Sequence, residues 1–548
     1  MTPPKTSPPK TTSPATSPDD TAPRPSKSRL NFARFRAVLV GAAVSRHSGP
    51  FVVILLALLH GLTWTVILVN LKAWQDIHMD VAEAFGWGQK FLMGYGKHPP
   101  LAGWVAGVWF QIFPIRDWST YALAMATVST GMVLCWRIAL HVVDRRRAFF
   151  VLVMLALYPL FTFKGFKFNP DLLQLVTLPL VVLAYLHAFR KRSLVSGVWL
   201  GLAAVAALLT KYWVLTMIGA IGLAALIDPL RMKFLRSPAP WAAFATCVAG
   251  ITPHLMWLAG VGFVPLIYAG ETYSRNDRSV VLRMVINYVE HNAAMLVAPL
   301  VLAALALALV RPWRPLSRII TGSWKRGANR AVKAVAARQV WIIQIIVAIG
   351  PLIGAMVADV SVKTDWGISL FFLVPLAVVA IPALRLRRAA LFNITAIWLT
   401  VTVGTLLASP LIVSAVIAAN SNNMATYGAH SELARELTQL WHRRFGTRWE
   451  VVAGPMNASQ TMVFYSPDHP RAFMPLEPWG SGLTSVDDLR HYGFIAVWEA
   501  SDGRAPALAK WLTEIAPNAQ RLVMTTRRYI RSQPGPPITW DVYVAPPQ

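Results

Sequence analysis

The chain has 548 residues, of which 55% are hydrophobic and 14% charged, with a mean hydropathy of +0.47. Soluble proteins carry charge on about a quarter of their residues, so this composition excludes an ordinary soluble protein and indicates a polytopic membrane protein. The net charge of +27 arises mostly in short loops between apolar runs, which indicates topology rather than nucleic-acid binding. The two cysteines, Cys135 and Cys247, lie inside apolar runs, so neither a disulfide framework nor a thiolate metal site is expected.

The N-terminal segment, residues 1–35, is rich in Pro, Ser, Thr and Lys. Such a composition buries too little apolar surface to fold, and we predict a disordered cytoplasmic tail. The first strong apolar run, Phe51 to Leu71, is too long for the core of a signal peptide and follows a basic stretch. We therefore expect it to be a retained first span.

Further apolar runs have the roughly 16 to 25 residues that cross ~30 Å of hydrocarbon at ~1.5 Å per residue. With the first span they predict an α-helical polytopic membrane protein with about eleven transmembrane helices. These later runs are 118–140, 149–164, 171–189, 195–211, 212–227, 239–259, 294–310, 340–358, 367–384 and 390–416. The resulting transmembrane domain covers 36–419, with an outer loop at 72–117.

The apolar segment Pro99 to Pro114 is short, opens with two prolines and is rich in tryptophan, which is typical of an interfacial helix. We leave it out of the spans. With the N-terminus inside, the remaining spans then place five basic clusters on the cytoplasmic face, as the positive-inside rule requires. Counting 99–114 as a span would reverse every later loop.

From residue 420 to 548 the pattern changes to short strands alternating with helices, which predicts a small α/β domain on the outer side. The expected strands are Glu450–Ala453, Met462–Tyr465, Phe494–Trp498, Leu522–Thr526 and Thr539–Val544. The expected helices are Glu432–Phe445, Ser485–Tyr492 and Pro506–Ile515, the second opening with a capping box of Ser485 and Asp488.

The first outer loop carries the most informative residues. If 76–91 is a helix, Asp76, Asp80 and Glu83 share one face. Three neighbouring carboxylates repel one another, raise at least one pKa, and suit a general base or a cation site. A solvated polar face of an interfacial helix explains the same spacing.

The loop also carries a recognisable order of motifs: Asp80-Val81-Ala82-Glu83, Trp87-Gly88-Gln89, Gly94-Tyr95, Lys97-His98-Pro99-Pro100-Leu101 and Trp104. This order resembles the first periplasmic loop of family 39 glycosyltransferases, a class C family similar to the protein O-mannosyltransferases and the lipid A aminoarabinose transferases. Later segments extend the resemblance over roughly 50 to 410: Phe168-Asn169-Pro170-Asp171, Lys211-Tyr212, Pro253-His254, Tyr268-Ala269, and Lys363 with Trp366. Many members carry Asp-Glu where this chain has Asp80-Val81, which leaves Glu83 as the candidate second carboxylate.

The resemblance implies an inverting transferase that moves a sugar from a polyprenyl-phosphate donor to an envelope acceptor at the periplasmic face of a bacterial inner membrane. Asp80 would be the general base. The acceptor stays open: lipid A or lipopolysaccharide, another lipid or glycan, or a protein. The departing phosphate needs positive charge, so basic and polar outer-side residues become candidate substrate contacts. The full set of these contacts is Tyr95, Lys97, His98, Asn169, Asp171, Lys211, Tyr212, Tyr268, Arg275 and Lys363.

Several of these residues have simpler explanations. A lysine at the end of a span, such as Lys211, often extends to the lipid headgroups, and Asp171 would favour a helix start. No cofactor is certain, although Asp80, Glu83 and Asp171 have the oxygen ligands that a divalent ion accepts. Competing functions are a membrane transporter, which would carry charge inside its spans, and an envelope scaffold built on the C-terminal domain.

Overall fold

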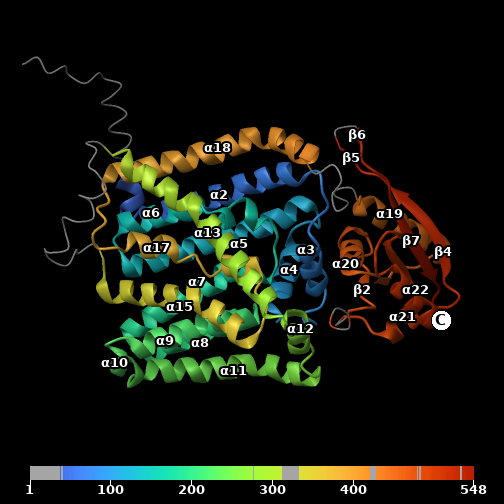
Figure 1. Ribbon diagram of the computed structural model, residues 1–548, viewed down its shortest axis with the longest axis horizontal. Coiled ribbons are helices and arrows are strands. Elements are labelled where there is room, and N and C mark those ends of the chain that lie inside the picture. Colours follow the sequence, from blue (N-terminus) through green and yellow to red (C-terminus); the bar gives the residue numbers. More distant parts are fainter. Residues whose placement is uncertain are drawn as a thin grey trace, which may run out of the picture.

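The computed structural model describes residues 41–275, 277–310, 332–419, 428–477, 483–530 and 533–548, together with Val38 and Trp479. The predicted disordered tail at 1–35 lies outside the described residues. The chain forms a bundle of long, roughly parallel helices, and a smaller α/β unit packs against one end of that bundle (Figure 1). We call this end of the bundle the domain-side end and the opposite end the far end.

Seven described helices are long and apolar enough to cross a membrane. They are α2 (Gly49–Lys72), α5 (Asp117–Val142), α7 (Pro170–Lys191), α11 (Pro238–Gly260), α13 (Arg278–Ala308), α15 (Ala334–Ala358) and α18 (Arg388–Ala419). These helices coincide with seven of the expected runs, so the chain is an α-helical, multi-pass membrane protein.

The other four expected spans are short or broken in the structure. The run 149–164 becomes α6 (Arg145–Ala156) followed by 3-10 turns to Phe166, with a 75° bend at Pro159, because proline disfavours helix in the residue before it. The runs 195–211 and 212–227 become the shorter helices α8 (Leu194–Leu208) and α9 (Leu215–Ile227).

The run 367–384 is not a continuous helix. It is divided into α16 (Thr364–Ile368) and α17 (Val374–Val379), with an irregular segment between them. The side chains from Leu370 to Leu373 in this segment are buried. Irregular backbone is tolerated at membrane depth where protein surrounds it, which accounts for the break.

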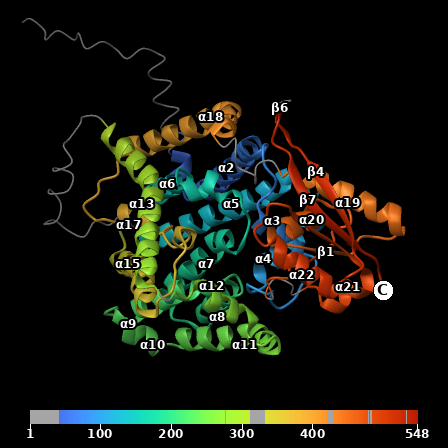
Figure 2. The same cartoon turned by 45° about the vertical axis from the view of Figure 1, so that its right-hand side comes forward.

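The segment excluded from the spans contains α4 (Leu101–Ile112), of 12 residues. At about 1.5 Å per residue such a helix covers only ~18 Å, too little to cross the hydrocarbon. It lies at the domain-side end beside α3 (Met79–Gly88), and Figure 2 shows both near the α/β unit. Its interfacial placement stays a prediction.

The C-terminal unit contains a five-stranded sheet of order β2-β1-β3-β7-β4. Its strands are β1 (Val451–Ala453), β2 (Arg471–Phe473), β3 (Phe494–Glu499), β7 (Ile538–Ala545) and β4 (Gln520–Thr526), and β5 (Tyr529–Ile530) and β6 (Gln533–Pro534) form a separate pair. β1 lies parallel to β2 and β3, whereas β7 is antiparallel to β3 and β4.

Four helices accompany this sheet: α19 (His430–Phe445), α20 (Met456–Tyr465), α21 (Val486–Tyr492) and α22 (Ala505–Ile515). The expected helices are all present, and Ser485 and Asp488 form the expected capping box. The strand expected at Met462–Tyr465 is wrong, because those residues end α20. That helix provides the crossover between the parallel strands β1 and β2, a connection that normally requires a helix.

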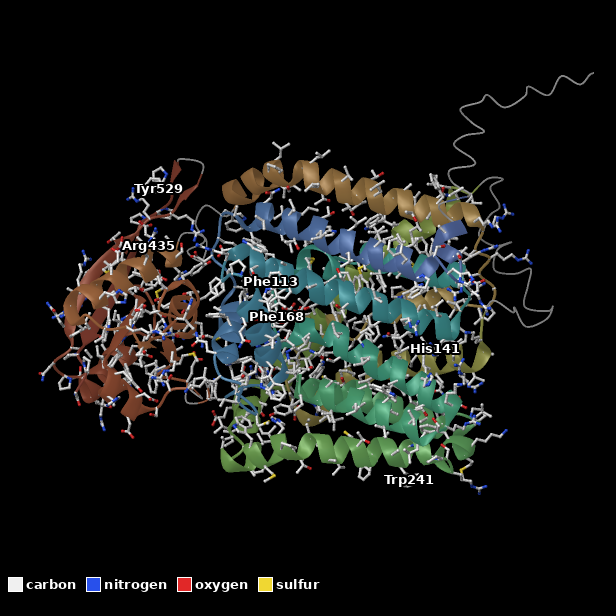
Figure 3. The ribbon with its side chains drawn as sticks, turned by 180° about the vertical axis from the view of Figure 1, so that it is seen from behind. Phe113, His141, Phe168, Trp241, Arg435 and Tyr529 are labelled. Carbon is white, nitrogen blue, oxygen red and sulfur yellow. The ribbon has the colours of Figure 1, made fainter. Side chains whose placement is uncertain are left out.

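The basic loops gather at the far end. α10 (Arg231–Leu235), the start of α6 and the end of α7 all lie there (Figure 1). Figure 3 shows His141 and Trp241 at this end, whereas Phe168 lies near the α/β unit. The two ends of the bundle therefore differ in charge as the positive-inside pattern predicts.

Candidate active site

Helix α3 carries the two central carboxylates. It begins at Met79 and ends at Gly88, so the helix expected over 76–91 is shorter than predicted. His78 caps it, because the Nδ1 atom of His78 accepts a hydrogen bond from the backbone N–H of Asp80 at 3.1 Å. Asp80 and Glu83 remain one turn apart on the same face.

Asp76 does not belong to this face, which corrects the prediction of three aligned carboxylates. It lies before the helix, where its Oδ2 accepts hydrogen bonds from the backbone N–H of His430 at 3.1 Å and from the His430 ring at 2.9 Å. Arg528 binds the other oxygen. Asp76 therefore ties the start of α3 to the α/β unit.

The apolar face of α3 fixes the direction of its carboxylates. Ile77, Val81 and Phe85 lie in one buried cluster with side chains of the α/β unit. Their spacing of four residues keeps them on one side of the helix. Asp80 and Glu83 consequently point to the other side, toward the bundle.

Asp80 is held by groups from the loop before α7. The Nδ2 atom of Asn169 donates to its Oδ2 at 3.0 Å, and the Nζ atom of Lys167 lies 3.5 Å from the same oxygen. Burial alone would raise the pKa of Asp80, but His78, Lys167 and Asn169 outweigh it and lower the pKa to about 2. Its side chain is 26% exposed, so the carboxylate is both ionised and reachable.

Glu83 occupies a different environment one turn away. Its Oε1 lies 2.6 Å from the Nζ atom of Lys97, and both side chains are buried. Burial raises the pKa of Glu83 to about 7, although Lys97 opposes the shift. Burial would lower the pKa of Lys97, but Glu83 reverses the effect and raises it. Because Glu83 is enclosed, it contacts Lys97 rather than solvent.

A third acid–lysine pair lies on the neighbouring spans. The Nζ atom of Lys211, in the turn after α8, is 2.6 Å from the Oδ1 of Asp171 at the start of α7. The same lysine lies 5.1 Å from the centre of the Trp366 ring. Lys211 is buried, so the pair is an inward-facing ion pair rather than a lysine that extends to the headgroups.

His98 links these pairs electrostatically. Burial together with Lys211, Lys97 and Lys363 lowers the pKa of His98 well below its ordinary value, while Asp80 acts in the opposite direction. The imidazole is therefore neutral and available as a hydrogen-bonding group. The four charged groups that act on His98 come from four separate segments, so the structure brings these predicted residues together.

Aromatic rings border the same region. The hydroxyls of Tyr268 and Tyr273, on α12 (Val264–Tyr273), are 3.1 Å apart, and the Tyr273 ring meets Trp366 edge to face. Lys363 is exposed, and its Nζ atom lies 5.1 Å from the centre of the Tyr273 ring. Lys97 and Lys363 both act electrostatically on Tyr268, which places this tyrosine beside the lysines.

Tyr95 and Tyr212 have packing contacts. The Tyr95 ring stacks on Trp87 with centroids 5.1 Å apart, and its hydroxyl donates to the carbonyl of Lys90 at 2.7 Å. Tyr212 bonds the ring of His254 at 3.1 Å. For both tyrosines, contact with a substrate stays a prediction.

Gly94 explains part of the loop motif. A Cβ atom at Gly94 would lie 2.1 Å from the Trp257 ring, so only glycine fits there. Gly96 is similarly restricted, because its Cβ atom would lie 1.2 Å from the carbonyl oxygen of Trp479 in the α/β unit. The loop is therefore enclosed from both sides.

Arg275 is set apart from the cluster. Its backbone N–H donates to the carbonyl of Asp359 and its guanidinium to the carbonyl of Ser274. None of the described acids or lysines of the site contacts it or is acted on by it electrostatically. Contact of Arg275 with a substrate stays a prediction.

Sequence reasoning did not assign Asp365. The Nζ atom of Lys167 lies 3.5 Å from an oxygen of Asp365 and 3.5 Å from Asp80, so one lysine bridges two acids from distant segments. Lys167 was not among the predicted contacts either, although a lysine on the outer side, where few basic residues are expected, is a usable signal. Asp365 had none, because the motif matched only its neighbours Lys363 and Trp366.

The three acids considered for a metal each contact a lysine. Asp80 faces Lys167, Glu83 faces Lys97 and Asp171 faces Lys211. Within the described ranges, no three His, Cys, Asp or Glu side chains are grouped as metal ligands. Since these side chains do not form a metal site as they stand, we derive no chemical step through a metal.

Comparison with known proteins gives this geometry a context. Residues 97–257 match the family model described as dolichyl-phosphate-mannose-protein mannosyltransferase. The resemblance to family 39 glycosyltransferases is confirmed. The matched segment contains Lys97, His98, Asn169, Asp171 and Lys211, whereas Asp80, Glu83 and Lys363 lie outside it.

A curated relative is the lipid A galacturonosyltransferase RgtD of Rhizobium johnstonii, 26% identical over 209 residues. The alignment covers 35% of this chain and 41% of the relative, so the chain matches less than half the length of that protein. Two solved structures of ArnT from Cupriavidus metallidurans are also similar. The apo form has 16% identity and a TM-score of 0.48, and the form bound to undecaprenyl phosphate 15% and 0.47. Each covers 92% of this chain and 100% of the ArnT chain.

Proposed function

We propose that this protein is an inverting glycosyltransferase that moves a sugar from a polyprenyl-phosphate donor to an acceptor of the bacterial cell envelope. The observation that carries the proposal is the meeting of Asp80, Glu83 and Asp171 with Lys97, Lys167 and Lys211 at one end of the bundle. Transfer from a lipid phosphate needs a base for the acceptor and cations for the phosphate, and this cluster has both.

The proposed reaction is a single displacement at the anomeric carbon. The acceptor hydroxyl or amine attacks that carbon, a new bond forms on the side opposite the phosphate, and the bond between the carbon and the phosphate oxygen breaks. Asp80 accepts the acceptor proton, and the polyprenyl phosphate leaves with the electron pair. The configuration is inverted because attack and departure occur on opposite faces.

We assign phosphate binding first to Lys167. The Nζ atom of Lys167 lies 3.5 Å from a carboxylate oxygen of both Asp80 and Asp365. This distance is longer than that of a strong charge-assisted hydrogen bond, so a phosphate oxygen could bind the lysine more closely than either acid does. A phosphate that pairs with Lys167 would weaken its hold on Asp80, whose pKa is lowered to about 2 in the free protein. Donor binding would then raise the pKa of Asp80 and make it a better base.

The two other pairs supply position rather than proton transfer. Glu83 keeps Lys97 buried and charged beside His98. Asp171 holds Lys211 close to the Trp366 ring. Both lysines are thus fixed before substrate binds, so little reorganisation is needed when charge develops on the leaving phosphate.

The site would face the periplasm of a bacterial inner membrane. The far end of the bundle carries the basic clusters typical of a cytoplasmic face, which leaves the domain-side end and the α/β unit outside. In this arrangement residues 36–419 are the transmembrane transferase domain, 420–548 the periplasmic domain, and the tail at 1–35 is cytoplasmic.

Lipid A is the acceptor that the relatives favour, since the curated relative is named a lipid A galacturonosyltransferase. Mass spectrometry of envelope lipids and glycans from cells with and without the gene tests this. We expect one sugar-modified lipid A or lipopolysaccharide species to disappear with the gene and to return with the wild-type protein. Identical profiles of lipids, glycans and glycoproteins would contradict the proposal.

A further inference from the structure

A groove lies near the far end of the bundle, away from the candidate active site. It has a volume of about 330 Å³ and lies between α5, α7 and α8. One part is lined by Arg137, His141 and His187, and the rest by apolar side chains. The groove therefore has a basic part, which carries one arginine and two histidines, and an apolar part.

The order of these parts follows from the helix directions. His141 is the second-last residue of α5 and His187 is in the last two turns of α7, so both lie near the membrane boundary at the far end. Leu183 and Leu180 come one and two turns earlier, toward the bilayer centre. The seven residue-to-residue steps from Leu180 to His187 cover about 10 Å along the helix axis.

The basic part of the groove has no acidic partner among the described residues. Arg137 is exposed, and neither it nor His141 or His187 forms an ion pair in the described ranges. The positive charge at this part of the groove comes from Arg137, with Arg190 close enough to act electrostatically on both histidines and Lys333 on His141. Unpaired positive charge next to a membrane attracts anions.

An arginine near the end of a span often extends toward the lipid headgroups, and this would explain the exposed position of Arg137. It does not explain the hollow behind Arg137, which is bordered by Leu202 and by Trp199, a residue that is 63% exposed. Neighbouring helices close such space when nothing occupies it. A tryptophan at this depth is typical of contact with lipid at the boundary between headgroups and chains.

We propose that this groove binds an anionic phospholipid from the leaflet at the far end of the bundle. The phosphate of the headgroup would contact Arg137 and His187, and one acyl chain would lie along Leu180, Leu183 and Leu202. Basic pockets between helices at a membrane surface bind such headgroups. The site is separate from the sugar-transfer cluster, so the inference does not depend on the proposed reaction.

Native mass spectrometry of the full-length protein in detergent tests the site. Phosphatidylglycerol and phosphatidylcholine with the same acyl chains are titrated separately, and retained lipid is counted. We expect tighter binding of phosphatidylglycerol. In Arg137→Gln its affinity should fall about fivefold, which corresponds to the ~1 kcal/mol expected for one cationic side chain near anionic lipid.

Two further variants test separately the charge of Arg137 and the free volume of the groove. Arg236→Gln removes an exposed arginine near the same end, outside the groove, and should bind phosphatidylglycerol like the wild type. Ala184→Phe fills the groove while Arg137 remains, and should also weaken binding. Equal affinity for both lipids, or equal loss in Arg137→Gln and Arg236→Gln, would overturn the proposal.

Glycerophosphoglycerol, which lacks acyl chains, is the last arm of the test. If it competes for the site as well as the intact lipid, the groove binds a free anion and the phospholipid assignment is wrong. We expect no measurable competition at concentrations that saturate with phosphatidylglycerol, because the apolar part would stay unfilled.

Discussion

Asp80 and Glu83 are one helical turn apart, yet their pKa values move in opposite directions. Asp80 reaches about 2, because His78, Lys167 and Asn169 outweigh its burial. Glu83 reaches about 7, because burial outweighs its contact with Lys97. Two carboxylates with separated pKa values can take different roles in one reaction. The structure thus separates a charged, reachable acid from a buried one.

Lys167→Gln tests whether the lysine links donor binding to the base. Loss of a charge-assisted contact of roughly 1.5 to 3 kcal/mol should raise KM for the polyprenyl-phosphate sugar about tenfold or more. Steady-state kinetics in reconstituted vesicles measures this KM. Lys164→Gln is the matched control, since Lys164 lies on the same segment without a described contact to Asp80. A similar KM in both variants would show that Lys167 does not bind the donor.

Glu83 predicts a pH dependence. Because its pKa in the folded protein is raised to about 7, Glu83 is protonated below that pH and forms a full ion pair with Lys97 only above it. We expect the transfer rate to rise between about pH 6 and 8. Glu83→Gln should remove that rise in a pH–rate profile. A rise that persists unchanged in the variant would assign it to another group.

At the scale of elements, α3 depends on the α/β unit. Its apolar face completes the core of that unit, and the backbone N–H of Ile77 donates a hydrogen bond to the hydroxyl oxygen of Tyr465 at 2.9 Å. Asp76 adds its contacts with His430 and Arg528. The α/β unit is therefore part of what positions Asp80, and not an independent appendage.

Arg528→Gln should disturb this connection. Removing one partner of a buried ion pair costs about 3 to 5 kcal/mol, so the unfolding transition in detergent should shift to lower temperature and the transfer rate should fall. Arg521→Gln is the control, since Arg521 forms an ion pair with Asp541 but is 60% exposed. Equal unfolding temperatures in the two variants would contradict a supporting role for Arg528.

The same network has a defined pH window. Burial would raise the pKa of Asp76, but His430 and Arg528 lower it to about 2. A carboxyl whose pKa is lowered by folding stabilises the protein above its ordinary pKa of about 4, and this contribution is lost as the pH falls toward 2. Arg528→Gln should reduce that acid sensitivity.

The elements predicted correctly from the sequence are those with strong local patterns. Long apolar runs became long helices, and the capping box at Ser485 marked α21 correctly. The strand expected at Met462–Tyr465 failed because a short apolar stretch fits a buried helix equally well. Asp76 was misplaced because its partners, His430 and Arg528, are more than 350 residues away in the chain. Such pairings have no local signal.

The cluster itself was predicted through motifs rather than geometry. The resemblance to a known family assigned Asp80, Lys97, Asp171 and Lys211 to one predicted site. In the structure the Nζ atom of Lys211 lies 2.6 Å from the Oδ1 atom of Asp171. No spacing in the sequence indicates which lysine pairs with which acid. Asp365 was missed for that reason.

At the scale of the whole molecule, the two ends of the bundle are chemically different. Acids, paired lysines and the α/β unit lie at one end, and basic clusters lie at the other. An enzyme that takes its donor from a lipid leaflet needs its site at the membrane surface, and the domain-side end meets that requirement. Chemical labelling can test on which side of the membrane this end lies.

Thiol labelling of intact cells tests the orientation. In a background with Cys135→Ser and Cys247→Ser, a membrane-impermeant reagent should modify Asp487→Cys, whose side chain is 93% exposed in the α/β unit. Lys233→Cys, in α10 at the far end, should react only after the inner membrane is permeabilised. The reverse pattern would place the candidate site in the cytoplasm and contradict the proposed topology.

The most direct measurement is turnover of a polyprenyl-phosphate sugar by the purified protein in vesicles, with products identified by mass spectrometry. Asp80→Asn should lose at least about 100-fold in rate, the lower range for removing a general base. Asp487→Asn, an equivalent change at an exposed position, should retain the wild-type rate. Wild-type turnover by a folded Asp80→Asn variant would contradict the assignment of this cluster as the site of sugar transfer.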